Sequence, residues 1–263
     1  MFQVFVFLRP CTLQAQQFLA ARRLRNRQVR LLVAAMFCAA ASSSVHAGRP
    51  MATDDAAVLD EGACQLEAWT EHSPGLNTTW LNPSCNPFGA TEFALGAARQ
   101  QDRKDSANNS ALVSWQIKHL LRAYDEQRAG FAVATGGQHT RLSGDNEIFI
   151  KGIATLPLRG ESLLAHINAG GIRQRDRQGG NYRGTWGVAL DGEAWNATRA
   201  SLETFGMTGS GSAARTNWQA GLRRELIPGR LQLDASIGSP FGHWSDSRIV
   251  TVGLVFVTPA FMR

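Results

Sequence analysis

Apolar and polar residues alternate strictly along much of this chain, and this period of two constrains its fold more than any other feature. Apolar side chains occupy every second position from Trp218 to Leu222 and again from Leu231 to Ile237, with the turn sequence Ile227-Pro-Gly-Arg230 between the two runs. Such a pattern predicts an antiparallel hairpin with one apolar and one polar face. Two folds use such hairpins: a soluble β-sandwich with the apolar face inward, and a membrane β-barrel with the apolar face outward.

The same alternation recurs along most of the chain. About twelve segments show it: 64–71, 76–82, 91–99, 110–122, 128–137, 146–156, 162–174, 182–191, 196–206, 215–225, 230–238 and 248–257. No segment has the pattern of a long amphipathic helix, and no apolar run reaches the ~20 residues that a membrane-spanning helix needs. The chain is therefore expected to be all-β.

The connections between these segments favour the barrel over the sandwich. From residue 99 onward, long connections (99–109, 137–145, 174–181, 207–215 and 239–247) alternate with short ones (124–127, 157–160, 192–195 and 227–230). Outer-membrane barrels have short turns at the periplasmic side and longer loops outside. We therefore predict an antiparallel transmembrane β-barrel of about twelve strands over residues 64–263, with both termini in the periplasm.

The first 47 residues carry the positive charge of the chain. They hold six arginines and no acid, and removing these six from the 27 basic residues leaves as many bases as the 21 acids. The basic composition therefore does not indicate a nucleic-acid partner. Arginine-rich sequence, the apolar run 31–41 and the end Val45-His46-Ala47 predict a signal peptide over residues 1–47, cleaved after Ala47, with translation starting nearer Leu24 or Val29.

Export of the chain to the bacterial outer membrane follows from this reading, because signal peptide and barrel occur together there. Residues 48–63 lack alternation and are expected to form a periplasmic N-terminal segment. Within it, Thr53-Asp54-Asp55 could hold a metal, but capping of a turn is the favoured interpretation. Barrel-assembly machinery is an expected partner, since it typically recognises an aromatic residue at the end of the last strand. Phe256 or Phe261 would serve here, in place of the last residue.

Two cysteines remain after cleavage of the signal peptide. Cys64 opens the first predicted strand and Cys85 follows the second, so the barrel brings both to the same rim. An exported protein with two cysteines most often bonds them, and we predict a Cys64–Cys85 disulfide. The sequence contains no cluster of Cys and His with the spacing of a metal site, and no cofactor is expected.

The polar face is too rich in opposite charges and amides to serve solubility alone, and it suits the lumen of a barrel. The residues predicted to face the lumen are Lys118, Glu147, Lys151, His166, Arg183, Arg199, Glu203, Arg223 and Asp234. Because acids and bases are interleaved, salt bridges that fill a narrow lumen are favoured over an anion-selecting row. The seven tryptophans are expected mainly in girdles at the membrane interfaces, with a stacking platform for an aromatic ligand as the alternative.

Several stretches resemble a known family. Residues 49–56, 62–69, 221–226 and 231–236 resemble bacterial outer-membrane β-barrel transporters related to the phenol-degradation meta-pathway outer-membrane proteins. The resemblance implies an outer-membrane barrel that passes small molecules, hydrophobic ones included. It does not identify the solute.

Three functions are considered. The leading one is a passive channel or transporter for small solutes. A lipid-acting hydrolase would need a Ser/His pair, and the candidates are His139 with Ser143, His119 with Ser114, and His166 with Ser162. None of these serines lies in a Gly-x-Ser-x-Gly elbow, so no catalytic residue is expected.

The third is a structural or adhesion barrel whose outer loops bind a partner. The loop charges at 102–105 and 173–177 could contact lipid or lipopolysaccharide phosphates, although solvated surface is the favoured interpretation.

Overall fold

The structure is a computed structural model that describes residues 50–176, 179–209 and 216–262. The predicted signal peptide, residues 1–47, and its cleavage site lie outside the described residues.

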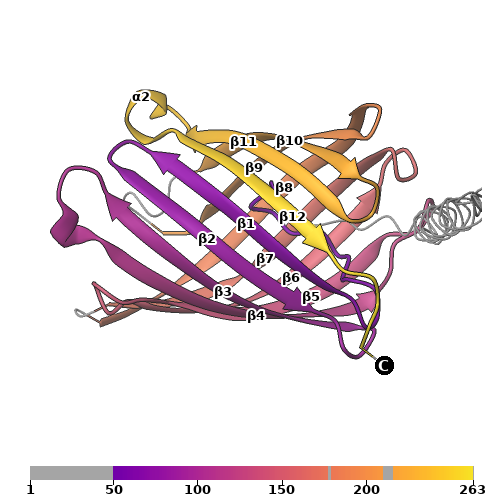
Figure 1. Cartoon of the computed structure of the whole chain (residues 1–263), viewed down its shortest axis with the longest axis horizontal. Coiled ribbons are helices and arrows are strands. Elements are labelled where there is room, and N and C mark those ends of the chain that lie inside the picture. The colour runs from indigo at the N-terminus through magenta and orange to yellow at the C-terminus, as the bar shows by residue number, and fades with distance from the viewer. Residues whose placement is uncertain (1–49, 177–178, 210–215, 263) are drawn as a thin grey trace, which may run out of the picture. The chain divides into compact units, whose positions relative to one another are not determined.

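Twelve antiparallel strands form a closed barrel in which each strand pairs with its neighbours in the sequence and β12 closes the sheet onto β1 (Figure 1). The strands are β1 (Cys64–Ser73), β2 (Leu76–Cys85), β3 (Thr91–Asp102), β4 (Ser110–Arg122), β5 (Gly130–Thr140), β6 (Asn146–Pro157), β7 (Leu163–Asp176), β8 (Gly179–Trp195), β9 (Thr198–Met207), β10 (Asn217–Ile227), β11 (Leu231–Pro240) and β12 (Ile249–Val257). The predicted all-β, twelve-stranded antiparallel barrel is thereby confirmed.

The two ends of the barrel differ. One end, here called the helical end, carries the short helices η1 (Ser106–Asn108) and α2 (Trp244–Ser247) in its connections. At the other end, here called the terminal end, β1 begins and β12 finishes, and Figure 1 shows the C-terminus there, opposite α2. Among the described residues, no helix is long and apolar enough to span a bilayer.

One expected long connection is absent. Residues 174–181 were predicted as a loop, but β7 extends to Asp176 and β8 begins at Gly179, with Gln174 paired to Asn181 and Asp176 to Gly179. These paired residues are charged residues, amides and glycines, so they lack the apolar alternation by which a strand is recognised. The alternation of long and short connections is therefore weaker than the sequence indicated, since 103–109 and 123–129 have the same length.

The two faces of the wall follow the period-two pattern. Outward positions carry exposed apolar side chains, such as Leu95 at 67%, Ile150 at 65% and Val252 at 54% exposure. Inward positions carry buried polar ones, such as Glu203 and Asp234 at 3% and 1%. In a soluble sandwich this relation would be reversed, so the pattern fits a barrel with lipid outside and water or packed polar groups inside.

The predicted disulfide is present. Cys64 and Cys85 face each other at the terminal ends of β1 and β2, and their sulfurs are 2.03 Å apart. The bond therefore links the strand that closes the barrel to its neighbour.

The orientation of the faces yields a prediction. Ile150→Lys on β6 places a charge in lipid, and we expect it to lower the free energy of unfolding by about 2–4 kcal/mol if it lies near the bilayer midplane. Urea unfolding of the protein refolded in lipid vesicles measures this. The control is Gln116→Lys on the lumen side of β4, which should change stability much less; equal losses would contradict the assignment of the faces.

Candidate functional site

The most unusual feature of the lumen is the N-terminal segment, residues 50–63, which runs inside the barrel before β1 (Figure 1). Several of its residues are almost fully buried, and Thr53, Asp55 and Ala56 are 1%, 3% and 0% exposed. Its start contacts β9 and β10 and its end contacts the β2–β3 connection, so it crosses the lumen while descending to the terminal end. Residues 48–63 were predicted to form a periplasmic segment before the barrel, and no sequence pattern indicates these contacts with the lumen wall.

Glu203 on β9 holds the start of the segment. Its two carboxylate oxygens accept hydrogen bonds from the backbone N–H groups of Ala52 and Thr53, each at 2.8 Å. Two glycines on the neighbouring wall leave space for the segment. A Cβ added at Gly187 would lie 2.6 Å from Thr53 Oγ1, and one added at Gly221 would lie 2.5 Å from Pro50 Cγ.

The middle of the segment is held by an amide and two lysines. Asn168 on β7 accepts from the Asp54 N–H and donates to the Asp54 carbonyl, each at 2.8 Å. Lys151 on β6 pairs with the Asp54 carboxylate, and Lys118 on β4 pairs with Asp55 at 3.3 Å. The two acids were interpreted as turn caps, and Asp55 does accept a hydrogen bond from the Ala57 N–H at 2.8 Å. Both acids are in addition ion-pair partners of the wall, which was not predicted.

Charge neutralisation in the lumen favours this arrangement. Burial alone would raise the pKa of Asp54, but the nearby ammonium groups of Lys151 and Lys118 outweigh it and hold that pKa below its ordinary value. Asp54 therefore stays ionised at neutral pH, and each buried lysine keeps a counter-charge.

Residues 56–59 of the segment make both hydrogen bonds and apolar contacts with the wall. The Ala56 N–H donates to Thr155 Oγ1, which also hydrogen-bonds His166 Nδ1 at 2.9 Å. The Ala56 side chain lies in an apolar cluster on β5 and β6, and Leu59 packs with Val255 and Val257 of β12. The segment is thus attached over its length to both sides of the wall.

The predicted lumen residues separate into three groups. Lys118, Lys151, His166 and Glu203 surround the N-terminal segment, as described above. Arg199 and Arg223 meet at the terminal end, where Asp191 accepts from both at 3.1 and 3.0 Å. Glu147 and Arg183 lie nearer the helical end and bond Gln174 and Thr208, while Asp234 on β11 is buried.

The decisive partners were missed: Asp54, Asp55 and Asp191 were not on the list of lumen residues. Asp191 is an even number of residues from Arg183 on β8, so both side chains face the lumen. The alternation could therefore have identified Asp191. The two acids of the segment lie outside any alternating pattern and could not be identified in this way.

The segment lies between two cavities. One, of about 480 Å³, lies against β1–β6 and is bordered by Glu67, Glu92, Lys118 and Glu147. The other, of about 240 Å³, lies against β6–β10 and is bordered by Lys151, Asn168, Thr185 and Asn217. Ala52 borders both. The larger cavity is bordered mainly by polar side chains, whereas Phe149, Ile172, Phe205 and Met207 also border the smaller one. The segment separates the two cavities.

Two tryptophans contribute to the larger cavity. Trp69 and Trp80 stack across β1 and β2 with ring centroids 5.4 Å apart, and both border this cavity. The favoured expectation of interface girdles is therefore wrong for this pair, which faces the lumen. Trp218 and Trp244 stack at the helical end, at 5.6 Å.

The candidate Ser/His pairs do not form. Each histidine hydrogen-bonds another group: His119 bonds Thr91, His139 bonds Asn146, and His166 bonds Thr155. His119 and Ser114 also lie on opposite faces of β4, since they are an odd number of residues apart. In the described part of the chain, no three His, Cys, Asp or Glu side chains are grouped to hold a metal ion.

A family profile described as "Uncharacterised conserved protein UCP029691" matches residues 34–255. The chain belongs to this family. No curated protein matches it.

Solved structures with a similar fold include outer-membrane porins and channels. The COG4313 outer membrane channel from Pseudomonas putida F1 aligns with a TM-score of 0.58 and 12% identity, over 79% of this chain and all of that one. The KdgM porin in complex with disordered oligogalacturonate aligns at 0.57 and 10%, and the NanC porin at 0.56 and 11%; each alignment covers 73% of this chain and 98% of the other. At these identities the likeness shows the fold. None of these descriptions names the phenol-degradation group, whose resemblance stays a prediction.

The anchoring of the segment can be tested with Glu203→Ala. Losing two charge-assisted hydrogen bonds, each contributing about 1.5–3 kcal/mol, should raise the population of released segment at least about tenfold. Endoproteinase Asp-N, which cleaves before aspartate, should then cut at Asp54 and Asp55 correspondingly faster. The control is Glu147→Ala, a lumen carboxylate bonded to Gln174 and not to the segment. Unchanged cleavage in Glu203→Ala would contradict the anchor.

The lowered pKa of Asp54 predicts a pH dependence. A depressed folded-state pKa contributes stability that is fully present above the ordinary value of 3.8 and is lost as pH falls through the folded-state value. Asp54→Asn should therefore weaken amide-exchange protection of Ala52, Thr53 and Ala56 at neutral pH, and its difference from the native protein should vanish in acid. A difference independent of pH would exclude ionised Asp54 as the cause.

Proposed function

We propose that this protein lies in the outer membrane, with its terminal end toward the periplasm, and forms a passive channel for small solutes. The observation that best supports this proposal is a closed barrel with an apolar exterior, whose lumen retains a cavity on each side of the N-terminal segment. The fold shared with outer-membrane channels supports the proposal.

The wall chemistry favours polar solutes in the lumen. Ionised and amide side chains border both cavities, and a hydrophobic molecule passing them would displace their water without replacing its hydrogen bonds. The Trp69–Trp80 stack adds one aromatic surface to the larger cavity. Passage of hydrophobic compounds, which the family resemblance implies, would therefore need a route other than the lumen.

The N-terminal segment controls the width of the path. It is bonded to β4, β6, β7 and β9, so solutes must pass beside it or wait for its release. We therefore expect small conductance steps from the native protein and larger ones when the segment is displaced.

A barrel that stays closed is the second candidate, and the same contacts favour it. If the segment never leaves, the structural or adhesion role considered above remains, with the outer surface and the loops as the working parts. The two candidates differ in whether ions cross the lumen.

Single-channel recording tests both. We expect Gly187→Ala combined with Gly221→Ala to increase conductance over the native protein at least about twofold, because the added methyl groups overlap Thr53 and Pro50 and push the segment from the wall. Gly152→Ala is the matched control: it lies on the outer face of β6, and its Cβ would meet only Ala169 O, at 3.8 Å. Folded but silent barrels in all three proteins would overturn the channel and leave the closed barrel.

A further inference from the structure

The outer wall carries a groove that the channel function does not use. It lies toward the helical end of β3–β7, has a volume of about 530 Å³, and is bordered by the apolar side chains of Leu95, Val113 and Ile148. These three side chains are 67%, 54% and 55% exposed. Trp115 also borders the groove, and its indole lies against Gly137 of β5, where an added Cβ would be 2.9 Å from Trp115 Nε1.

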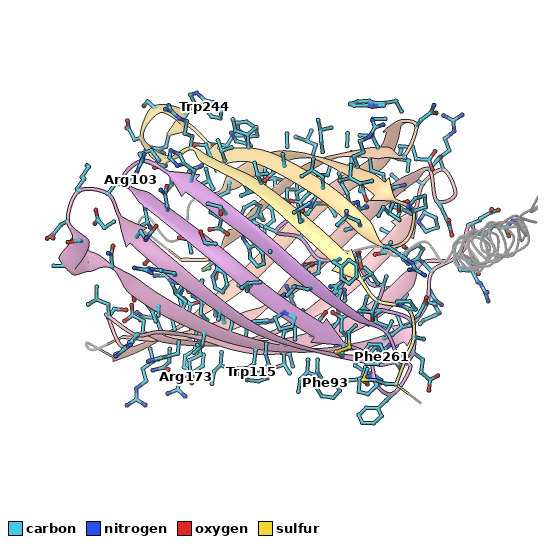
Figure 2. The ribbon with its side chains drawn as sticks, viewed as in Figure 1. Phe93, Arg103, Trp115, Arg173, Trp244 and Phe261 are labelled. Atoms are coloured by element: carbon cyan, nitrogen blue, oxygen red, sulfur yellow. A yellow bond between two sulfur atoms is a disulfide. The ribbon has the colours of Figure 1, made fainter. Side chains whose placement is uncertain are left out.

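Two arginines stand at the upper edge of this groove. Arg173 pairs across the sheet with Ile148, and Arg175 with Asn146, so both follow directly on the apolar surface. They are two residues apart on one strand and therefore point to the same face, with their Cα atoms roughly 7 Å apart. In Figure 2, Phe93, Trp115 and Arg173 all project away from the barrel on the same wall, with Arg173 nearest the helical end.

Among the side chains that the structure describes, no carboxylate pairs with either of these arginines. Both arginines border the groove. One acid, Glu147, borders the groove among the described residues. Its carboxylate accepts a hydrogen bond from the Gln174 side chain at 2.7 Å. Arg173 lies over the ring of Tyr182, 5.6 Å from its centroid, which holds the guanidinium at the level where aromatic residues line membrane interfaces.

Further hydrogen-bonding groups complete the edge. His139 Nδ1 and Asn146 Oδ1 are 3.0 Å apart and both residues border the groove, beside the arginines. Polar groups at the edge of an apolar groove match a ligand with a charged head group and an acyl chain. Paired guanidinium groups select phosphate, because they bind its oxygens through parallel charged hydrogen bonds.

We propose that this groove binds lipid A, the phosphorylated lipid of lipopolysaccharide, with a phosphate between Arg173 and Arg175 and an acyl chain along Leu95, Val113 and Ile148. The inference rests on the proposed outer-membrane location, because the helical end then faces the outer leaflet. It is independent of whether the lumen conducts.

Binding in detergent tests the site. The native protein, refolded free of lipopolysaccharide, is titrated with bisphosphorylated lipid A, with the same lipid after removal of both phosphates, and with phosphatidylglycerol. We expect lipid A to bind at least about tenfold more tightly than either of the others. This comparison uses only the native protein, so it does not depend on the folding of a variant.

The double substitution Arg173→Ala and Arg175→Ala should weaken lipid A binding at least about tenfold and leave single-channel conductance unchanged. The matched control is Arg122→Ala, since Arg122 also lies over an aromatic ring, that of Phe131 at 4.8 Å, but at the terminal end. It should change binding less than twofold.

Equal binding of dephosphorylated lipid, or undiminished binding by the double variant, would overturn the phosphate site. Equal binding of phosphatidylglycerol would overturn the assignment to lipid A. Lipid binding by a protein that proves silent in channel recordings would reject the proposed channel and keep the groove, so the two failures are distinguishable.

Discussion

Closure of the sheet through the pairing of β1 with β12 is the constraint on which the rest of the structure depends. A backbone N–H or C=O left unpaired in hydrocarbon costs several kcal/mol, so a sheet in lipid has no tolerable edge. Eight residue pairs from Gln65 to His72 join these strands, and the Cys64–Cys85 bond ties β1 to β2 beside that seam. Closure fixes an inside and an outside, and the period-two pattern then assigns each side chain to lipid or lumen.

The closed lumen also requires that its charged side chains be paired, and the N-terminal segment supplies two of the partners. Lysines, arginines and carboxylates face one another across a space too small to hydrate them all fully, and unpaired charges there would be costly. Asp54 and Asp55 neutralise Lys151 and Lys118, while Asp191 serves Arg199 and Arg223. The polar lumen is thus a network of specific ion pairs, with space for solutes in the two cavities beside the segment.

Much of this was predictable from sequence, and the failures have physical causes. Alternation locates the strands and their faces because a pleated strand has a period of two, as at Ile148 and Ile150. It fails at 174–181, where the strands leave the apolar layer, and at 50–63, where an extended chain follows the shape of the lumen and has no period. Pairs such as Thr53 with Glu203 are 150 residues apart and depend on closure, so no local pattern records them.

The position of that segment also has a consequence for the order of assembly. It is the first part of the barrel unit to be made, yet its partners lie on strands as late as β9 and β10. Its contacts therefore form only after most of the sheet is present, and long-range contacts of this kind form late because the intervening chain must first be ordered. Insertion into the membrane and filling of the lumen are consequently coupled. Until the late strands are in place, the segment is not held in the lumen and does not narrow it.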